Sequence, residues 1–134
     1  MAKLEKIEGM GEKYAHKLKD AGITTTDVLL EKGATSKGRK ELADTSGISE
    51  TLILKWVNQV DLARIHGISE EYGELLEVAG VDSVPELSLR NSENLYNNLV
   101  KVNDVKKLVR KLPSQGQVGT WIEEAKTLPR IVTH

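Results

Sequence analysis

The sequence predicts an all-α fold in two similar halves, and three features support this prediction. Apolar residues recur at helical intervals in one segment after another. No segment alternates apolar and polar residues over the length of a useful strand. The sequence also matches itself at a fixed offset, which is the signature of a duplicated supersecondary unit. We therefore expect two tandem domains of about five short helices each.

The repeat is seen when Ile7 is placed on Ile65, an offset of 58 residues. Each half also ends in a tryptophan helix, and Trp56 and Trp121 are 65 residues apart. We therefore expect an insertion of about seven residues in the second half, near 100–110. The predicted domains are 1–62 and a diverged copy over 63–134. At the first offset the matched positions are Gly9/Gly67, Met10/Ile68, Tyr14/Tyr72, Leu18/Leu76, Ala21/Ala79, Gly22/Gly80, Ile23/Val81 and Leu29/Leu87.

Helix boundaries follow from capping residues, glycines and prolines. In the first half, helix starts are placed at the turn 9–11, at the threonines 24–26, near Gly38 and at Ser49, with stops at Gly22 and at Ser46-Gly47. In the second half, starts are placed at Ser69 or Glu70, at Ser83 with Pro85 in the first turn, at Asn91 or Ser92, near 105 and at Ser114. Stops there are placed at Gly80 and at Pro113, which ends a helical segment predicted over 105–112.

The composition predicts a globular protein with an aliphatic core. The chain has 134 residues, of which 39% are hydrophobic and 29% charged, and it contains neither Phe nor Cys. Trp56 and Trp121 lie within apolar stripes and are expected in the core. Tyr14 and Tyr72 are expected in the core or at its boundary.

Several classes of function are disfavoured by what the sequence does not contain. There is no Cys, no apolar leader after Met1 and no apolar run near the ~18 residues of a membrane span, so we expect a cytoplasmic protein with no membrane contact. The three histidines have no partners at the spacing of metal ligands or of a catalytic triad. We therefore expect no metal site and no cofactor. The acidic residues of 70–77 fall on successive helical faces rather than forming an acid–base pair. We therefore expect no enzymatic activity.

The segment Ile7-Glu8-Gly9-Met10-Gly11, followed by Ala15, matches the pattern hydrophobic-X-Gly-hydrophobic-Gly of the helix-hairpin-helix motif. Glycine suits backbone conformations or close approaches that a Cβ would obstruct, and we expect Met10 to lie between the two helices. The turn leaves free N–H groups at the start of the following helix, where the helix dipole also favours an anion. Lys13 and Lys17 lie one turn apart, where each can reach a phosphate.

Three further turns resemble the first less closely. Ser46-Gly47-Ile48-Ser49 keeps one glycine and is basic only upstream, at Lys37, Arg39 and Lys40, a run expected in a solvated loop before a helix. His66-Gly67-Ile68-Ser69 is followed by Glu70 and Glu71, which would repel DNA. The segment 111–114 has no glycine, although the stretch 101–111 around it is basic.

With a turn of this kind at two corners, each half resembles the sterile-alpha-motif-like (SAM-like) domains found at recombinase N-termini and at the C-terminus of the RNA polymerase alpha chain. The strings at 7–15, 33–43 and 112–114 are similar to a bacterial helix-hairpin-helix family catalogued as a domain of unknown function (DUF4332). The resemblance implies a fold and an ancestry rather than an activity. Members of the wider superfamily bind nucleic acid, bind protein or serve as scaffolds.

Two functions remain open. The first is weak, sequence-independent binding of DNA or structured RNA through phosphate contacts at the first turn. The second is a protein-interaction adapter without nucleic-acid binding, in which the acidic surface 70–77 docks a basic partner; the formal net charge of −1 favours this alternative. The residues predicted to contact nucleic acid are Gly9, Met10, Gly11, Lys13, Lys17, Lys37, Arg39 and Lys40.

Overall fold

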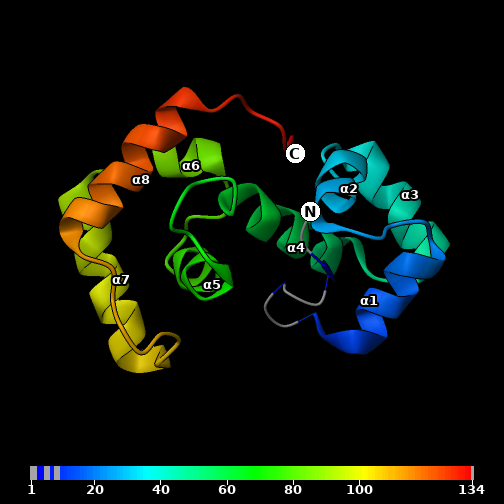
Figure 1. Ribbon diagram of the computed structural model, residues 1–134, viewed down its shortest axis with the longest axis horizontal. Coiled ribbons are helices and arrows are strands. Elements are labelled where there is room, and N and C mark those ends of the chain that lie inside the picture. Colours follow the sequence, from blue (N-terminus) through cyan, green and yellow to red (C-terminus); the bar gives the residue numbers. More distant parts are fainter. Residues whose placement is uncertain (1–2, 5–6, 8–9, 134) are drawn as a thin grey trace. The chain divides into compact units, whose positions relative to one another are not determined.

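A computed structural model describes residues 3–4, 7 and 10–133, apart from the side chain of Glu70 (Figure 1). This described part contains eight helices and no strand beyond an isolated bridge between Lys3 and Thr25, which confirms the all-α prediction. The chain divides into two compact units. The first is Met1–Asp61 together with Ile131–His134, and the second is Leu62–Arg130.

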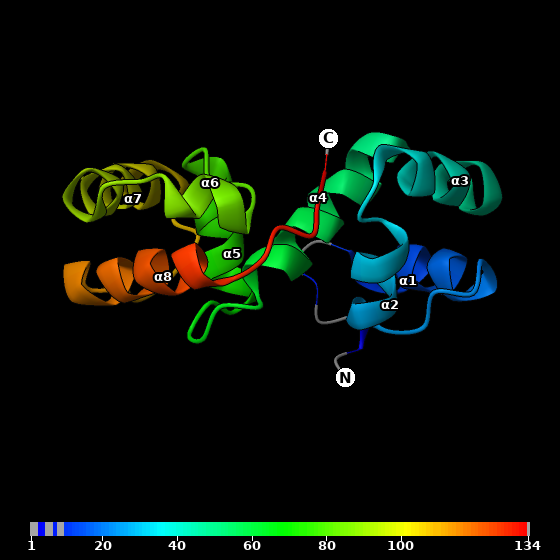
Figure 2. The same ribbon diagram turned by 90° about the horizontal axis from the view of Figure 1, so that it is seen from above.

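The first unit contains α1 (Gly11–Asp20), α2 (Thr26–Lys32), α3 (Ser36–Ser46) and most of α4 (Glu50–Leu62), drawn from blue to green in Figures 1 and 2. Three of these helices begin at the hydroxyl residues Thr25, Thr35 and Ser49. The side-chain oxygen of each accepts the backbone N–H three residues further on, at 3.3, 3.0 and 3.2 Å. These bonds satisfy N–H groups that have no partner within the helix.

The second unit contains α5 (Glu70–Val78), α6 (Val84–Ser88), α7 (Ser92–Lys106) and α8 (Gln115–Thr127). Its last three helices are capped as in the first unit, by Ser83, Asn91 and Ser114, whose side-chain oxygens accept N–H groups at 3.4, 3.1 and 3.1 Å. The two units therefore present the same order of one helix without a side-chain cap followed by three capped helices.

The inserted residues of the second unit lie in α7 and in the connection after it. The helix α7 has 15 residues against 11 in α3. The connection to the next helix spans 107–114, whereas its counterpart in the first unit spans 47–49. The predicted separate helix over 105–112 is therefore wrong: α7 continues to Lys106, and residues 107–114 are not helical.

The helix α7 ends where Lys107 takes the left-handed conformation, with φ of 55° and its N–H bonded to the Asn103 carbonyl at 2.8 Å. The Asn103 side chain then forms hydrogen bonds with both the N–H and the carbonyl group of Val109. Its Oδ1 accepts the Val109 N–H at 2.9 Å, and its Nδ2 donates to the Val109 carbonyl at 3.1 Å. This arrangement satisfies backbone groups that a helix would otherwise have satisfied.

Each unit has its own aliphatic core with one buried tryptophan. Trp56 and Trp121 are each 1% exposed, which confirms their predicted core positions. Tyr14 packs on Trp56 with ring centroids 5.3 Å apart, and Tyr72 packs on Trp121 at 5.4 Å, both in tilted arrangements. The aromatic pair is thus repeated with nearly the same geometry in both units, and both tyrosines lie at the core boundary.

The end of the chain folds as part of the first unit. Val132 is 1% exposed within that unit's core, and the Thr133 N–H donates to the Ala34 carbonyl at 2.8 Å. The Arg39 guanidinium donates to the carbonyls of Thr133, Gly33 and Ala34 at 2.7, 2.9 and 3.1 Å. Arg39 therefore holds the C-terminal segment against the connection between α2 and α3.

The run 37–40 is not the solvated loop that the sequence suggested. Thr35 caps α3, so these residues form its first turns, where Arg39 faces inward and is only 5% exposed. Burial lowers the pKa of the Arg39 guanidinium from its ordinary value, and the charge of Glu50 opposes this effect. Since arginine titrates far above neutral pH, the group stays charged and depends on its carbonyl partners.

We expect Arg39→Lys to lower the free energy of unfolding by about 1–3 kcal/mol, because an ammonium cannot reproduce the arrangement of donors and leaves buried carbonyls unpaired. Lys40→Arg on the exposed face of α3 is the matched control, with an expected change within about 0.5 kcal/mol. Urea denaturation followed by circular dichroism measures both. Equal effects of the two substitutions would contradict the role given to Arg39.

Candidate nucleic-acid interface

The turn before α1 is built on the buried residues Ile7 and Met10. The Ile7 N–H bonds to the Leu4 carbonyl at 3.0 Å, and the Met10 N–H bonds to the Ile7 carbonyl at 3.2 Å. Met10 is 2% exposed, so its side chain packs in the core of the first unit and only its backbone can face a ligand. Gly11 is exposed and has φ of +73°, a conformation that side chains disfavour. Gly9 lies outside the described residues.

The first turn of α1 has no side-chain cap. Met10 occupies the N-cap position and its side chain accepts no hydrogen bond. Among the described helices, α5 is the other whose N-cap residue makes no such bond, since Ser69 does not use its hydroxyl in this way. The two helices that follow the repeated turns, 7–11 and 65–69, therefore begin without a hydrogen bond from their first N–H groups to the side chain of the N-cap residue.

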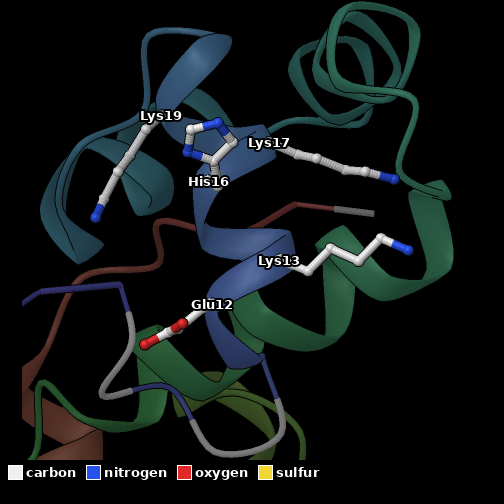
Figure 3. A pocket seen from close by; sticks show the side chains of 5 residues that line it. All are labelled: Glu12, Lys13, His16, Lys17 and Lys19. Atoms are coloured by element: carbon white, nitrogen blue, oxygen red, sulfur yellow. The ribbon is translucent and has the colours of Figure 1, made fainter.

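Lys13 and Lys17 lie on one face of α1 and extend to the same side (Figure 3). Neither forms an ion pair with another described residue, since Asp20 instead contacts His16 at 3.5 Å. The Lys17 Nζ lies 5.7 Å from the centroid of the Tyr14 ring, which restricts that side chain. The structure therefore places two cationic groups one helical turn apart on the same side of α1, with Lys13 in the first turn and Lys17 in the last.

The surface here is an open depression rather than an enclosed cavity. Its lining residues, Glu12, Lys13, His16, Lys17 and Lys19, all belong to α1, and Glu12 and Lys19 extend away from the side that Lys13 and Lys17 share (Figure 3). A depression with walls from one helix cannot surround a small molecule. It suits a ligand that lies across the surface and is held by charge.

The other predicted contact residues are not brought together with this pair as one set. Lys37 and Lys40 are exposed at the start of α3, a different helix of the same unit. Arg39 lies between them in sequence but is buried, and its guanidinium is occupied by three carbonyl groups. Of the predicted basic run, the two lysines are what the surface presents.

The turn 65–69 of the second unit contacts the carboxylate of Glu124, which belongs to α8. The sequence analysis did not predict this contact. The Glu124 carboxylate accepts the backbone N–H of His66 at 3.2 Å and lies 3.2 Å from the His66 Nδ1. In the tryptophan register of the repeat, position 124 corresponds to 59, where the first unit has glutamine. The alignment of the Glu124 carboxylate with the neutral amide of Gln59 was the one feature of the sequence that could have indicated this contact.

No group of three or more histidine, cysteine or carboxylate side chains is positioned to hold a metal ion among the described residues. Within the same part of the chain, no helix has both the length and the apolar character needed to cross a membrane.

These features define an all-α protein of two compact helical units with a basic surface at the first helix. The chain belongs to the family described as Domain of unknown function (DUF4332), whose model matches residues 8–128. Searches of curated proteins and of solved structures found no match.

We expect Gly11→Val to lower the free energy of unfolding by about 1–3 kcal/mol, because a β-branched residue is strained at φ of +73°. An added Cβ would meet no atom within 4 Å, so backbone strain rather than crowding causes the loss. Gly11→Asn is the control, with a smaller loss, since asparagine adopts this conformation more readily. Thermal unfolding of the variants measures both, and an unchanged melting temperature for Gly11→Val would show that the turn is built differently.

Proposed function

We propose that this protein is a non-catalytic binding module that holds the phosphate backbone of DNA or structured RNA at the start of α1. One observation carries the proposal: a turn with Gly11 at positive φ leads into a helix without a side-chain cap, and Lys13 in its first turn and Lys17 one turn further on extend to the same side. In this proposal each unit is a SAM-like helix-hairpin-helix domain, and the turns 7–11 and 65–69 are equivalent hairpins.

The physical basis of the binding is local. Backbone N–H groups at the start of a helix, reinforced by the helix dipole, favour a phosphate oxygen. Lys13 and Lys17 add two charges that can reach neighbouring phosphates, and both are free of competing carboxylates among the described residues. Because few phosphates are neutralised, the affinity is low and falls steeply with salt.

The proposed binding is independent of sequence. Recognition of bases needs side chains that reach base edges or stack on them. The nearest aromatic side chain, Tyr14, is half-buried and packed on Trp56, so it cannot lie flat against a base. Lysines and backbone amides contact phosphates, which carry no sequence information.

We expect Lys13→Glu with Lys17→Glu to abolish binding without unfolding the protein, because the change replaces two attractive charges by two repulsive ones. Fluorescence anisotropy of labelled duplex and single-stranded DNA, at ~50 and ~200 mM salt, measures the affinity and its salt dependence. The charge-matched control is Lys32→Glu with Arg130→Glu, at two exposed positions outside the proposed site. Wild-type affinity of the Lys13/Lys17 variant at ~50 mM salt would end the proposal for this site.

A second candidate function, the protein adapter, is favoured by the acidic turn of the second unit. Glu71 is exposed and Glu74 partly exposed on α5, and the Glu124 carboxylate already accepts the N–H of His66. A surface of this kind repels phosphate and suits a basic partner. If the wild-type protein binds no nucleic acid at ~50 mM salt, this function takes precedence, and pull-down with Glu71→Lys as the control variant tests it.

A further inference from the structure

A second set of cations gathers at the end of α7 and in the connection 107–114, which joins α7 to the first turn of α8 (Figure 1). We call this set the α7–α8 corner. All five side chains are exposed, and none forms an ion pair with another described residue. The cations of the corner are Lys101, Lys106, Lys107, Arg110 and Lys111.

The backbone of the corner is held in place although its charged side chains are exposed. The Asn103 side chain bonds to both peptide groups of Val109, and the Tyr72 hydroxyl donates to the Lys111 carbonyl at 2.9 Å. Val109 and Pro113 are buried, and they anchor the loop to the core. The lysines and the arginine therefore extend from a defined backbone, which reduces the entropy lost when a ligand orders them.

The equivalent corner of the first unit carries the opposite charge. There the connection between α3 and α4 is only 47–49, and the exposed charged residues around it are Glu41, Asp44 and Glu50. The residues inserted in the second unit supply most of the cations of the α7–α8 corner. Within 101–122 the sequence contains one acidic residue, Asp104, so the five cations of the corner face a single carboxylate.

Gly116, in the first turn of α8, has no steric reason to be glycine. A Cβ added there would have one neighbour within 4 Å, the Ser114 Oγ at 3.9 Å, which is an ordinary contact. Its φ also lies outside the left-handed region. Glycine in a helix is unfavourable relative to alanine, and one use of it is to let a ligand approach the backbone closely.

From the charge, the bracing and the open surface at Gly116, we propose that the α7–α8 corner is a second contact surface for the phosphate backbone of nucleic acid. This inference rests on the proposed function, because it assumes that the ligand is a nucleic acid. It adds the surface by which the second unit contacts that ligand. The corner suits a polyanion rather than a lipid surface, because Leu108 and Leu112 pack against the core and Val105, at 77%, is the one exposed apolar side chain of the corner.

The test compares the full-length wild type with Lys106→Gln plus Lys111→Gln. Removal of two phosphate contacts should reduce the slope of log K against log salt by about 1.8 for duplex DNA. The matched control, Lys32→Gln plus Arg130→Gln, removes the same charge at exposed positions outside both proposed surfaces. Its slope should equal that of the wild type. A slope that falls equally in both variants, or in neither, overturns the inference.

A second variant separates binding from folding. Gly116→Ala should raise the melting temperature, because alanine favours a helix, and yet weaken DNA binding, because its methyl group covers the exposed backbone in the first turn of α8. Unchanged affinity of Gly116→Ala would overturn the use of this surface. Binding to phosphatidylserine vesicles that the corner variant loses, with its DNA binding unchanged, would overturn the choice of nucleic acid.

The two proposals fail in different ways. If the wild type binds DNA and the corner variant binds as the control does, the corner is wrong and the site at α1 stands. If the Lys13/Lys17 variant binds like the wild type while the corner variant loses affinity, the site at α1 is wrong and the corner stands. If the wild type binds no DNA at ~50 mM salt, both proposals fail.

Discussion

The buried guanidinium of Arg39 determines how the first unit is assembled. A charge inside a protein is tolerated only when polar groups replace the water it has lost, and here three carbonyl groups do so. One of them belongs to Thr133, so the first unit requires the last segment of the chain. Residues 62–130 therefore form a unit inserted between two parts of the first one, with a covalent connection at each end. The same contact removes from the surface a cation that would otherwise belong to the basic run 37–40.

The repeated elements of the two units are those that fix the backbone, and the elements that differ are those that carry charge. Three capped helices and one tyrosine–tryptophan pair recur in each unit. At the turn 65–69 the Glu124 carboxylate accepts a backbone N–H, whereas the helix after the equivalent turn of the first unit carries Lys13 and Lys17 on one side. The charges differ in the opposite sense at the connection before the last helix of each unit. They are acidic around the α3–α4 connection and basic at the α7–α8 corner. A duplicated scaffold can in this way keep its fold while the two copies acquire different surfaces.

Local signals in the sequence predicted most of the fold, and contacts between distant residues produced the exceptions. Ser49 and Ser114 were placed as caps because capping depends on residues three positions apart. Arg39 and Thr133 are 94 residues apart, and nothing in the run 37–40 distinguishes the buried cation from the exposed ones. The predicted helix 105–112 was wrong because Lys107 adopts a conformation unusual for lysine, stabilised by Asn103 and Val109 across the loop. At the candidate site, spacing predicted that Lys13 and Lys17 share a face of one helix. Spacing could not predict the contact of Glu124 with His66, because these residues are 58 positions apart.

A formal net charge of −1 does not argue against binding to a polyanion when charges of each sign are segregated. At physiological salt, exposed charges interact strongly over only about 8 Å, so a phosphate bound on α1 is attracted by the lysines of that helix and not by the net charge of the whole chain. The proposed surfaces at α1 and at the α7–α8 corner each neutralise few phosphates, and each is therefore weak by itself. Because one chain carries both, engagement of the first raises the effective concentration of the second along the same polyanion. Two weak surfaces in a nearly neutral protein thus suit a long nucleic acid better than a short one.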